Sequence, residues 1–229
     1  MSSERDYARD LYPFLYAPTS DAVGSGASLL ETVRQSTLAK CADVIELRSE
    51  LLAEYDVQLV RVARLMADRF ARAGKLLAFG NGGSATDADD AAADCMRPPF
   101  RSWRSLPALS LPSDSATLSA MTNDVGLASV FARQIGALGA PDDIAVGFST
   151  SGNSENVVAA FAEARKRGLL TVAFSGYDGG AVARSGSVDA CFVARREFVP
   201  RIQEGHATLW HVLLGLVQDA MAEDAQECR

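Results

Sequence analysis

The chain has 229 residues, of which 48% are hydrophobic and 22% are charged, as expected for a globular protein with a substantial core. Its net charge of −7 at pH 7 disfavours nucleic acid and anionic membrane surfaces as partners, and no apolar run approaches membrane-spanning length. The four cysteines form no CxxC pair, and the charged N-terminus has no apolar signal segment, so we expect a cytoplasmic protein with reduced thiols.

Residues 1–27 are predicted to form an N-terminal extension, because they contain two prolines and a Gly-Ser-Gly stretch without sustained periodicity. The remaining residues, 28–229, are predicted to form one domain. From residue 28 to about residue 73, apolar residues recur at helical spacing in two runs. This pattern predicts two helices, with Gly74 as the C-cap of the second.

Short apolar runs alternate with helical segments through the rest of the chain. Five runs are predicted strands: 75–79, 106–111, 144–148, 169–174 and 190–193. Helices are expected at 85–96, 114–121, 130–138, 156–167 and 203–221. Continuous apolar strands separated by helices are typical of a parallel sheet that is covered on both faces. We therefore predict an α/β fold, a three-layer α/β/α sandwich with a five-stranded parallel sheet, preceded by N-terminal helices.

The turn after the third predicted strand carries four hydroxyl side chains within six residues, namely Ser149, Thr150, Ser151 and Ser154. A helix begins directly after it, so free backbone N–H groups and the positive end of the helix dipole are available to an anion. Hydroxyls and N–H groups can hold a phosphate without Lys or Arg, which predicts a sugar-phosphate site. The alternative at this stage is ordinary helix capping by Ser and Thr.

A second turn, Asn81-Gly82-Gly83-Ser84, follows the first predicted strand. Its glycines let the backbone approach a ligand closely, and the Asn81 amide can both donate and accept hydrogen bonds. The alternative is a tight turn that needs glycine for geometry only. Ligands of open α/β sheets bind beyond the carboxyl ends of the strands, so both turns are expected at one crevice. A true dinucleotide fingerprint and a GxxxxGK[ST] loop are missing, which argues against the usual NAD and ATP sites.

These turns occur in order with Asn123-Asp124, Asp178-Gly179-Gly180 and Arg201-Ile202-Gln203-Glu204. The set resembles the sugar isomerase (SIS) domain family, and more narrowly the phosphoheptose isomerases, over about residues 28–222. The resemblance implies a flavodoxin-like sheet and an aldose–ketose isomerase that converts sedoheptulose 7-phosphate to D-glycero-D-manno-heptose 7-phosphate through an enediol. It also implies a homotetramer whose subunits share sites. The substrate contacts that it implies are Asn81, Gly82, Gly83, Asn123, Asp124, Ser149, Thr150, Ser151, Ser154 and Gln203.

The resemblance further implies a divalent metal, zinc in the family. Gln203 and His211 match two ligand positions, and their spacing places them on one face of the last helix. The family's third ligand, a histidine, is Asp90 here, and its glutamate, both ligand and base, is Asp94. Aspartate can ligate zinc, so the implied metal ligands are Asp90, Asp94, Gln203 and His211. Asp94 is then the expected base, with His211 as the acid or as a ligand.

Two alternatives follow from the replacement of that histidine and glutamate. Asp90 and Asp94 can be surface acids near a helix N-terminus, where the helix dipole favours them, and this is the expectation for Asp87 and Asp89. The whole chain can also be a non-catalytic phosphosugar-binding or protein-partner module, because a close relative of the family binds a bacterial replication initiator protein. His206 is expected to be a bystander at the helix surface. Cys95 is expected to be a packed small hydrophobe.

Overall fold

The computed structural model describes residues 26–227, with side chains from Leu29 to Glu223. The predicted extension, residues 1–27, therefore lies almost wholly outside the described residues. The chain divides into two units, Met1–Asp43 and Val44–Arg229. Within the described part, no helix is both long enough and apolar enough to cross a membrane.

Helix α3 runs without interruption from Gly26 to Ala71. The prediction of two helices here is therefore wrong. Residues 53–58, between the two apolar runs, contain no glycine or proline, so nothing breaks the backbone hydrogen bonds. A change in apolar periodicity alters which face of a helix is buried, but it does not end the helix.

Helix α3 ends in a Schellman motif whose left-handed residue is Ala73, with a φ of 64°. The N–H of Gly74 donates to the carbonyl oxygen of Arg69 at 2.9 Å, and the N–H of Ala73 donates to that of Phe70 at 3.0 Å. Gly74 is thus not the left-handed cap that its sequence position suggested. A Cβ at Gly74 would overlap the carbonyl oxygen of Asp142, so glycine is needed there for close packing.

Replacing Ala73 by glycine is expected to stabilise the protein by about 1–2 kcal/mol, because the left-handed conformation is unfavourable for alanine but not for glycine. Gly74→Ala, one residue further on, is expected to destabilise the protein because its Cβ meets the Asp142 backbone. Urea unfolding of both variants gives the two changes in free energy. An Ala73→Gly protein less stable than its parent would contradict the assigned cap.

Five parallel strands form the sheet, and they are β1 (Leu76–Gly80), β2 (Ala108–Ser110), β3 (Ile144–Ser149), β4 (Leu170–Gly176) and β5 (Ala190–Ala194). The strand order is β2-β1-β3-β4-β5, and every pairing is parallel. The predicted five-stranded, flavodoxin-like sheet is confirmed, although β2 is shorter than expected. The order reverses between β1 and β3, and ligands of such sheets bind at this switch point.

The helices after the first strand are α4 (Gly83–Met96), α5 (Ser115–Val125), α6 (Val130–Leu138), α7 (Glu155–Lys166), α8 (Gly180–Arg184) and α9 (Val199–Glu227). A 3₁₀ turn, η1 (Leu127–Ser129), and the short helix α8 were not predicted. Helix α9 extends beyond the predicted 203–221 at both ends. Its Pro200 lies in the first turn, where a backbone N–H would have no acceptor within the helix, so the N–H that proline lacks is not missed by the helix.

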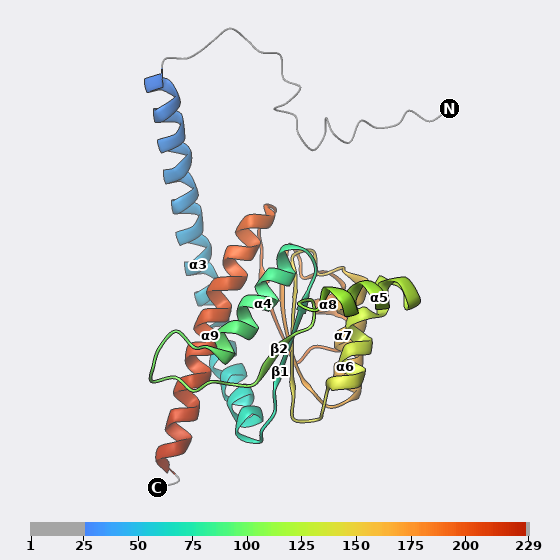
Figure 1. Ribbon diagram of the computed structural model, residues 1–229. Helices are drawn as coiled ribbons and strands as arrows, with labels where there is room; N and C mark the ends of the chain where they lie inside the picture. The colour runs from blue at the N-terminus through green and yellow to red at the C-terminus, as the bar shows by residue number, and fades with distance from the viewer. Residues whose placement is uncertain (1–25, 228–229) are drawn as a thin grey trace, which may run out of the picture. The chain divides into compact units, whose positions relative to one another are not determined.

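Helices α4 and α9 lie on one side of the sheet, and α6 and α7 on the other (Figure 1). Successive residues of β1 alternate between two cores: Leu76 and Ala78 pack with α4 and α9, whereas Leu77 and Phe79 pack with α6 and α7. Every residue of β1 is buried because both faces of the strand are covered. The predicted three-layer arrangement is confirmed.

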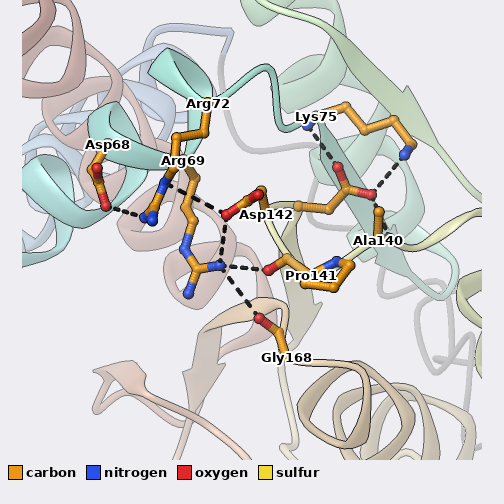
Figure 2. A network of polar contacts seen from close by, with 9 residues as sticks. Asp68, Arg69, Arg72, Lys75, Ala140, Pro141, Asp142 and Gly168 are labelled. Carbon is orange, nitrogen blue, oxygen red and sulfur yellow. Dashed lines mark hydrogen bonds and ion pairs between the residues drawn. The ribbon is translucent and has the colours of Figure 1, made fainter.

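A polar network joins the end of α3 to the loops near the amino ends of the strands (Figure 2). The buried carboxylate of Asp143 accepts hydrogen bonds from the backbone N–H of Lys75 at 2.9 Å, from Lys75 Nζ at 2.6 Å and from the N–H of Ala140 at 2.8 Å. Arg69 forms an ion pair with the more exposed Asp142 at 3.6 Å. Asp143 therefore satisfies two backbone donors that have to be paired for this junction to form.

Asp143→Ala is expected to lower the free energy of unfolding by about 2–4 kcal/mol, because it leaves two backbone N–H groups and the Lys75 ammonium without their acceptor. Asp142→Ala is the matched control, with an expected loss below about 1 kcal/mol because its ion pairs are exposed to solvent. Urea denaturation of both variants measures the difference. Equal losses for the two would show that the Asp143 hydrogen bonds are not the main stabilising contacts.

Candidate functional site

The two turns predicted to bind a ligand lie at the carboxyl ends of neighbouring strands, at the switch point. β1 ends at Gly80, β3 ends at Ser149, and Gly80 is paired with Phe148 in the sheet. A cavity of about 290 Å³ opens beside them, and it is lined by Asn81, Leu127, Ala128, Ser154, Glu155 and Asn156. The structure thus brings members of both turns to one crevice, as the sequence predicts.

Asn81 and Asn156 exchange two side-chain hydrogen bonds, each of 2.8 Å. Asn156 is buried in the first turn of α7, so the pair ties the glycine-rich turn to the hydroxyl-rich one. Each amide keeps a second N–H and a second lone pair for a ligand. Asn156 was not among the predicted site residues. Its only signal in the sequence is a polar side chain next to the apolar Val157.

The hydroxyl-rich turn does not cap its own helix. Ser154 is the N-cap residue of α7, but its side chain makes no capping hydrogen bond and lies instead 3.3 Å from the Ser149 hydroxyl. Ser149 is buried, while Thr150 and Ser151 are half-buried. The N–H of Val157 donates to the carbonyl oxygen of Ser154 at 3.0 Å, so the missing side-chain cap leaves the N–H groups of Glu155 and Asn156 to another acceptor. This geometry favours the anion-binding interpretation over the capping interpretation.

A second loop fixes the shape of this turn from behind. Gly152 has a φ of 63°, and a Cβ there would overlap the carbonyl oxygen of Gly179. The N–H of Val182 donates to the carbonyl oxygen of Gly152 at 2.9 Å, and the N–H of Ala181 donates to Asn153 Oδ1 at 2.9 Å. The Asp178-Gly179-Gly180 segment therefore supports the turn through close backbone packing.

Asn123 and Asp124 lie on the exposed surface of α5, where Asn123 Nδ2 donates to Asp124 Oδ1 at 3.1 Å. Helix α5 packs on η1 and α6. The cavity lining includes Leu127 and Ala128 of η1 but neither of these two residues. The structure does not bring Asn123 and Asp124 into the crevice.

Asp94 of α4 and His211 of α9 come together within one chain. The Asp94 Oδ2 atom lies 3.4 Å from His211 Nε2, and it accepts a hydrogen bond from Trp210 Nε1 at 3.2 Å. The Asp94 side chain is 28% exposed and that of His211 is 65% exposed, so a ligand can reach both. The expected acid–base pair is therefore adjacent. Trp210 was missed, because a tryptophan on an apolar helix gives no sign of its partner.

Gln203 lies against the start of α4. A Cβ at Gly83 would overlap the Gln203 amide, so glycine makes room for this side chain. Gln203 also lies close to Asp87, whose pKa is raised to about 6 because burial disfavours the charged carboxylate. Asp87 is thus turned toward the protein interior, and the expectation of a simple surface acid is wrong for it.

His206 is fully buried, and the expectation of a surface bystander is wrong. It shares one face of α9 with Ile202, Leu209 and Leu213, and this face packs on the sheet. His206 Nε2 donates to the carbonyl oxygen of Ser175 at 2.9 Å, and burial lowers the pKa of the imidazole to about 4. Its Nδ1 atom faces Asp87 Oδ2 at 4.0 Å, and neither atom has a hydrogen-bond partner among the described residues.

This buried pair predicts a specific pH dependence of stability. His206 has a lowered pKa, so its contribution is lost as the pH falls from the ordinary value of 6.5 to about 4, by about 3 kcal/mol. Asp87 has a raised pKa, so its contribution has the opposite sign and increases as the pH falls from about 6 to 3.8. Asp87→Asn removes this compensation.

We therefore expect Asp87→Asn to lose more stability on acidification than the parent protein does. Urea unfolding at several pH values between about 4 and 7 measures both curves. Parallel curves for parent and variant would contradict the opposing contributions of the two groups.

The remaining residues of α4 that the sequence singled out are Asp89, Asp90 and Cys95. Asp89 accepts hydrogen bonds of 2.5 Å from Ser110 and Ser113, and so ties α4 to the end of β2. Asp90 is exposed. Cys95 is fully buried, and burial raises its pKa to about 12, as expected for a packed thiol. The three described cysteines, Cys41, Cys95 and Cys191, are free thiols, while Cys228 lies outside the described residues.

Comparison with known proteins identifies the family to which this chain belongs. A model of the SIS domain matches residues 41–176. The phosphoheptose isomerase of Thermodesulfovibrio yellowstonii is 41% identical over 179 residues, which cover 78% of this chain and 88% of the relative. That of Aquifex aeolicus is 40% identical, with coverage of 78% and 92%.

Solved structures of phosphoheptose isomerases have the same fold as this chain. The phosphoheptose isomerase from Neisseria gonorrhoeae superposes with a TM-score of 0.75 at 34% identity, over 82% of this chain and 99% of that one. The enzyme from Francisella tularensis gives a TM-score of 0.74 at 27% identity, over 83% and 98%. The chain therefore belongs to the SIS domain family and, within it, to the phosphoheptose isomerases.

Proposed function

We propose that the chain is an aldose–ketose isomerase that converts sedoheptulose 7-phosphate to D-glycero-D-manno-heptose 7-phosphate. One observation carries the proposal: Asp94 and His211 lie 3.4 Å apart, in a chain about 40% identical to phosphoheptose isomerases. Isomerisation needs one group that moves a proton between two neighbouring carbons and a second group that exchanges protons with their oxygens. A carboxylate beside an imidazole can fill these two roles.

The hydroxyl-rich turn is proposed to hold the phosphate. The uncapped first turn of α7 offers N–H groups, and the surrounding hydroxyls supply further donors. Because these donors are neutral, release of the phosphate does not require an ion pair to be broken. The sugar contacts proposed with it are Asn81, Gly82, Gly83 and Gln203.

The chemical step moves one proton between two carbons. Asp94 removes a proton from C1 of the open-chain ketose, while His211 supplies a proton to the oxygen on C2, which gives an enediol. The carboxyl group of Asp94 then returns its proton to C2, and His211 takes the proton of the oxygen on C1, which becomes the aldehyde carbonyl. Atoms and charges balance, no redox cofactor takes part, and both residues end in their starting states.

The metal site implied by the resemblance does not fit the side chains as they lie. Among the residues that the structure describes, no three His, Cys, Asp or Glu side chains come close enough to hold a metal ion. The Asp94 carboxylate accepts a hydrogen bond from Trp210, Asp90 is exposed, and the Gln203 amide lies beside Gly83. Zinc sites in proteins use at least three protein ligands. The proton transfers proposed here use Asp94 and His211, and no step is routed through a metal.

The homotetramer that the family resemblance implies is proposed for this chain, and apolar side chains that one chain leaves exposed support an oligomer. Ile45, Leu52 and Val57 of α3 are 65%, 56% and 77% exposed. Contiguous exposed apolar residues mark interaction surfaces, and burial of these side chains against a second chain would remove them from water. Light scattering of the purified protein tests the assembly, and a monomer at micromolar concentration would contradict it.

The test of the function is an NMR assay of sedoheptulose 7-phosphate in D₂O, run once with a chelator and once with added zinc. We expect the aldose product and deuterium incorporation at the exchanging carbon in both samples. Turnover only with zinc would overturn the metal-free assignment but not the isomerase. Binding of the sugar phosphate without product or exchange in either sample would instead favour the non-catalytic binding module.

A further inference from the structure

Trp210 makes a contact that the proposed reaction does not yet use. Its side chain is 2% exposed, and its ring packs in the core near Phe174, at 6.5 Å between ring centroids. At its polar edge, Nε1 donates a hydrogen bond of 3.2 Å to Asp94 Oδ2. The two residues are 116 positions apart in the chain, so this bond connects α9 directly to α4.

The hydrogen bond restricts the Asp94 carboxylate more than an exposed donor would. A buried indole has little freedom to turn, because its large ring is fixed by packing on all sides. A hydrogen bond to an ionised carboxylate is also stronger than one between neutral groups. The orientation of Asp94 is therefore set by a rigid part of the core.

Both neighbours of the carboxylate approach the same oxygen. Trp210 Nε1 and His211 Nε2 lie 3.2 Å and 3.4 Å from Asp94 Oδ2. A carboxylate has two oxygens, and each can accept more than one hydrogen bond. Contacts that gather at Oδ2 leave Oδ1 as the oxygen available to a substrate proton.

We propose that Trp210 is a positioning residue for the isomerisation, which holds Asp94 by Oδ2 so that Oδ1 acts as the base. The inference rests on the proposed function, since it gives Asp94 the role of base. Trp210 itself touches neither the substrate nor the reacting atoms. Its contribution is to keep the carboxylate in the one orientation in which proton transfer occurs.

The chain offers a matched control in its second tryptophan. Trp103 is half-buried, and it packs against Phe100, with 4.9 Å between ring centroids, and near Gly215. Because the protein has two tryptophans, its spectrum contains two indole N–H resonances. Trp103→Phe removes one of them and so assigns both.

The first experiment tests the hydrogen bond without reference to activity. In ¹⁵N-labelled protein, Asp94→Ala is expected to shift the indole N–H signal of Trp210 and to speed its exchange with solvent by about tenfold or more. The signal of Trp103 is expected to stay in place. An unchanged Trp210 signal in Asp94→Ala would overturn the inference, whether or not the protein is an active isomerase.

The second experiment tests the positioning role. Trp210→Phe is expected to lower kcat by about 10- to 100-fold with little change in KM, since it removes a hydrogen bond and not a substrate contact. Trp103→Phe is expected to leave both constants unchanged. Benzothienylalanine, which replaces the indole N–H by sulfur at nearly constant shape, is then incorporated in the Trp103→Phe background, so that only position 210 carries it.

The sulfur analogue is expected to reproduce the loss of kcat seen in Trp210→Phe. Full activity of the analogue would overturn the inference, because it would show that the ring matters only for packing. A parent protein that shows the Asp94-dependent indole shift but has no turnover would overturn the proposed function and the positioning role together. The two kinds of failure are therefore distinguishable.

Discussion

Asp94→Asn is expected to lower kcat by about 10³-fold or more while KM changes little. Asparagine has nearly the same shape, and its amide oxygen can still accept the hydrogen bond from Trp210. What it lacks is the ability to take up a proton at neutral pH. The variant therefore separates proton transfer from folding and binding, and kcat and KM measured by the NMR assay report the result.

Asp90→Asn is the control for that experiment. Asp90 lies one helical turn before Asp94 and is exposed, so its replacement is expected to change kcat by less than about threefold. A comparable collapse in both variants would show that the two carboxylates act together, as the metal-ligand expectation from the sequence requires. Full activity of Asp94→Asn would remove Asp94 from the mechanism.

Gly152→Ala is expected to destabilise the protein by about 2–4 kcal/mol and to raise KM at least tenfold. Its φ of 63° disfavours alanine by about 1–2 kcal/mol, and the added Cβ overlaps the carbonyl oxygen of Gly179. The turn has to move away from the loop behind it. The donors of Ser151 and Ser154 then lose their positions, so the sugar phosphate binds less tightly.

Gly186→Ala is the control that separates the two effects of Gly152→Ala, namely backbone strain at a positive φ and displacement of the turn by the added Cβ. Gly186 has a nearly identical φ of 65°, but a Cβ there meets no heavy atom within 4 Å. We expect a loss of only about 1–2 kcal/mol and an unchanged KM. Urea denaturation and steady-state kinetics of the two variants give the comparison. Similar losses in both, with KM unchanged in Gly152→Ala, would mean that the turn does not hold the phosphate.

The sheet could be predicted because each strand is a short apolar run between turn residues. β3 and β4 are buried along their whole lengths, so an uninterrupted apolar run was enough to find them. Helix boundaries were less certain, because they depend on local caps. At the end of α3 the glycine suggested a cap at Gly74, whereas the left-handed residue is Ala73, and Gly74 is fixed by its contact with a loop far along the chain.

The crevice could be predicted for a similar reason. The turns at Asn81 and Ser149 follow strands, and the carboxyl ends of parallel strands necessarily meet at one edge of the sheet. Partners across helices could not be read in this way. Asn81 pairs with Asn156, and Asp94 with Trp210, through side chains that look like ordinary helix residues in the sequence.

By itself, the sequence determined the layers of this protein and the position of the turn proposed to bind phosphate, because periodicity and turn composition are local properties. The packing of α9 on α4 decided the rest. It buried His206 beside Asp87, and it placed Trp210 and His211 on the carboxylate of Asp94. These contacts depend on how two helices are rotated against each other, which no single stretch of sequence encodes.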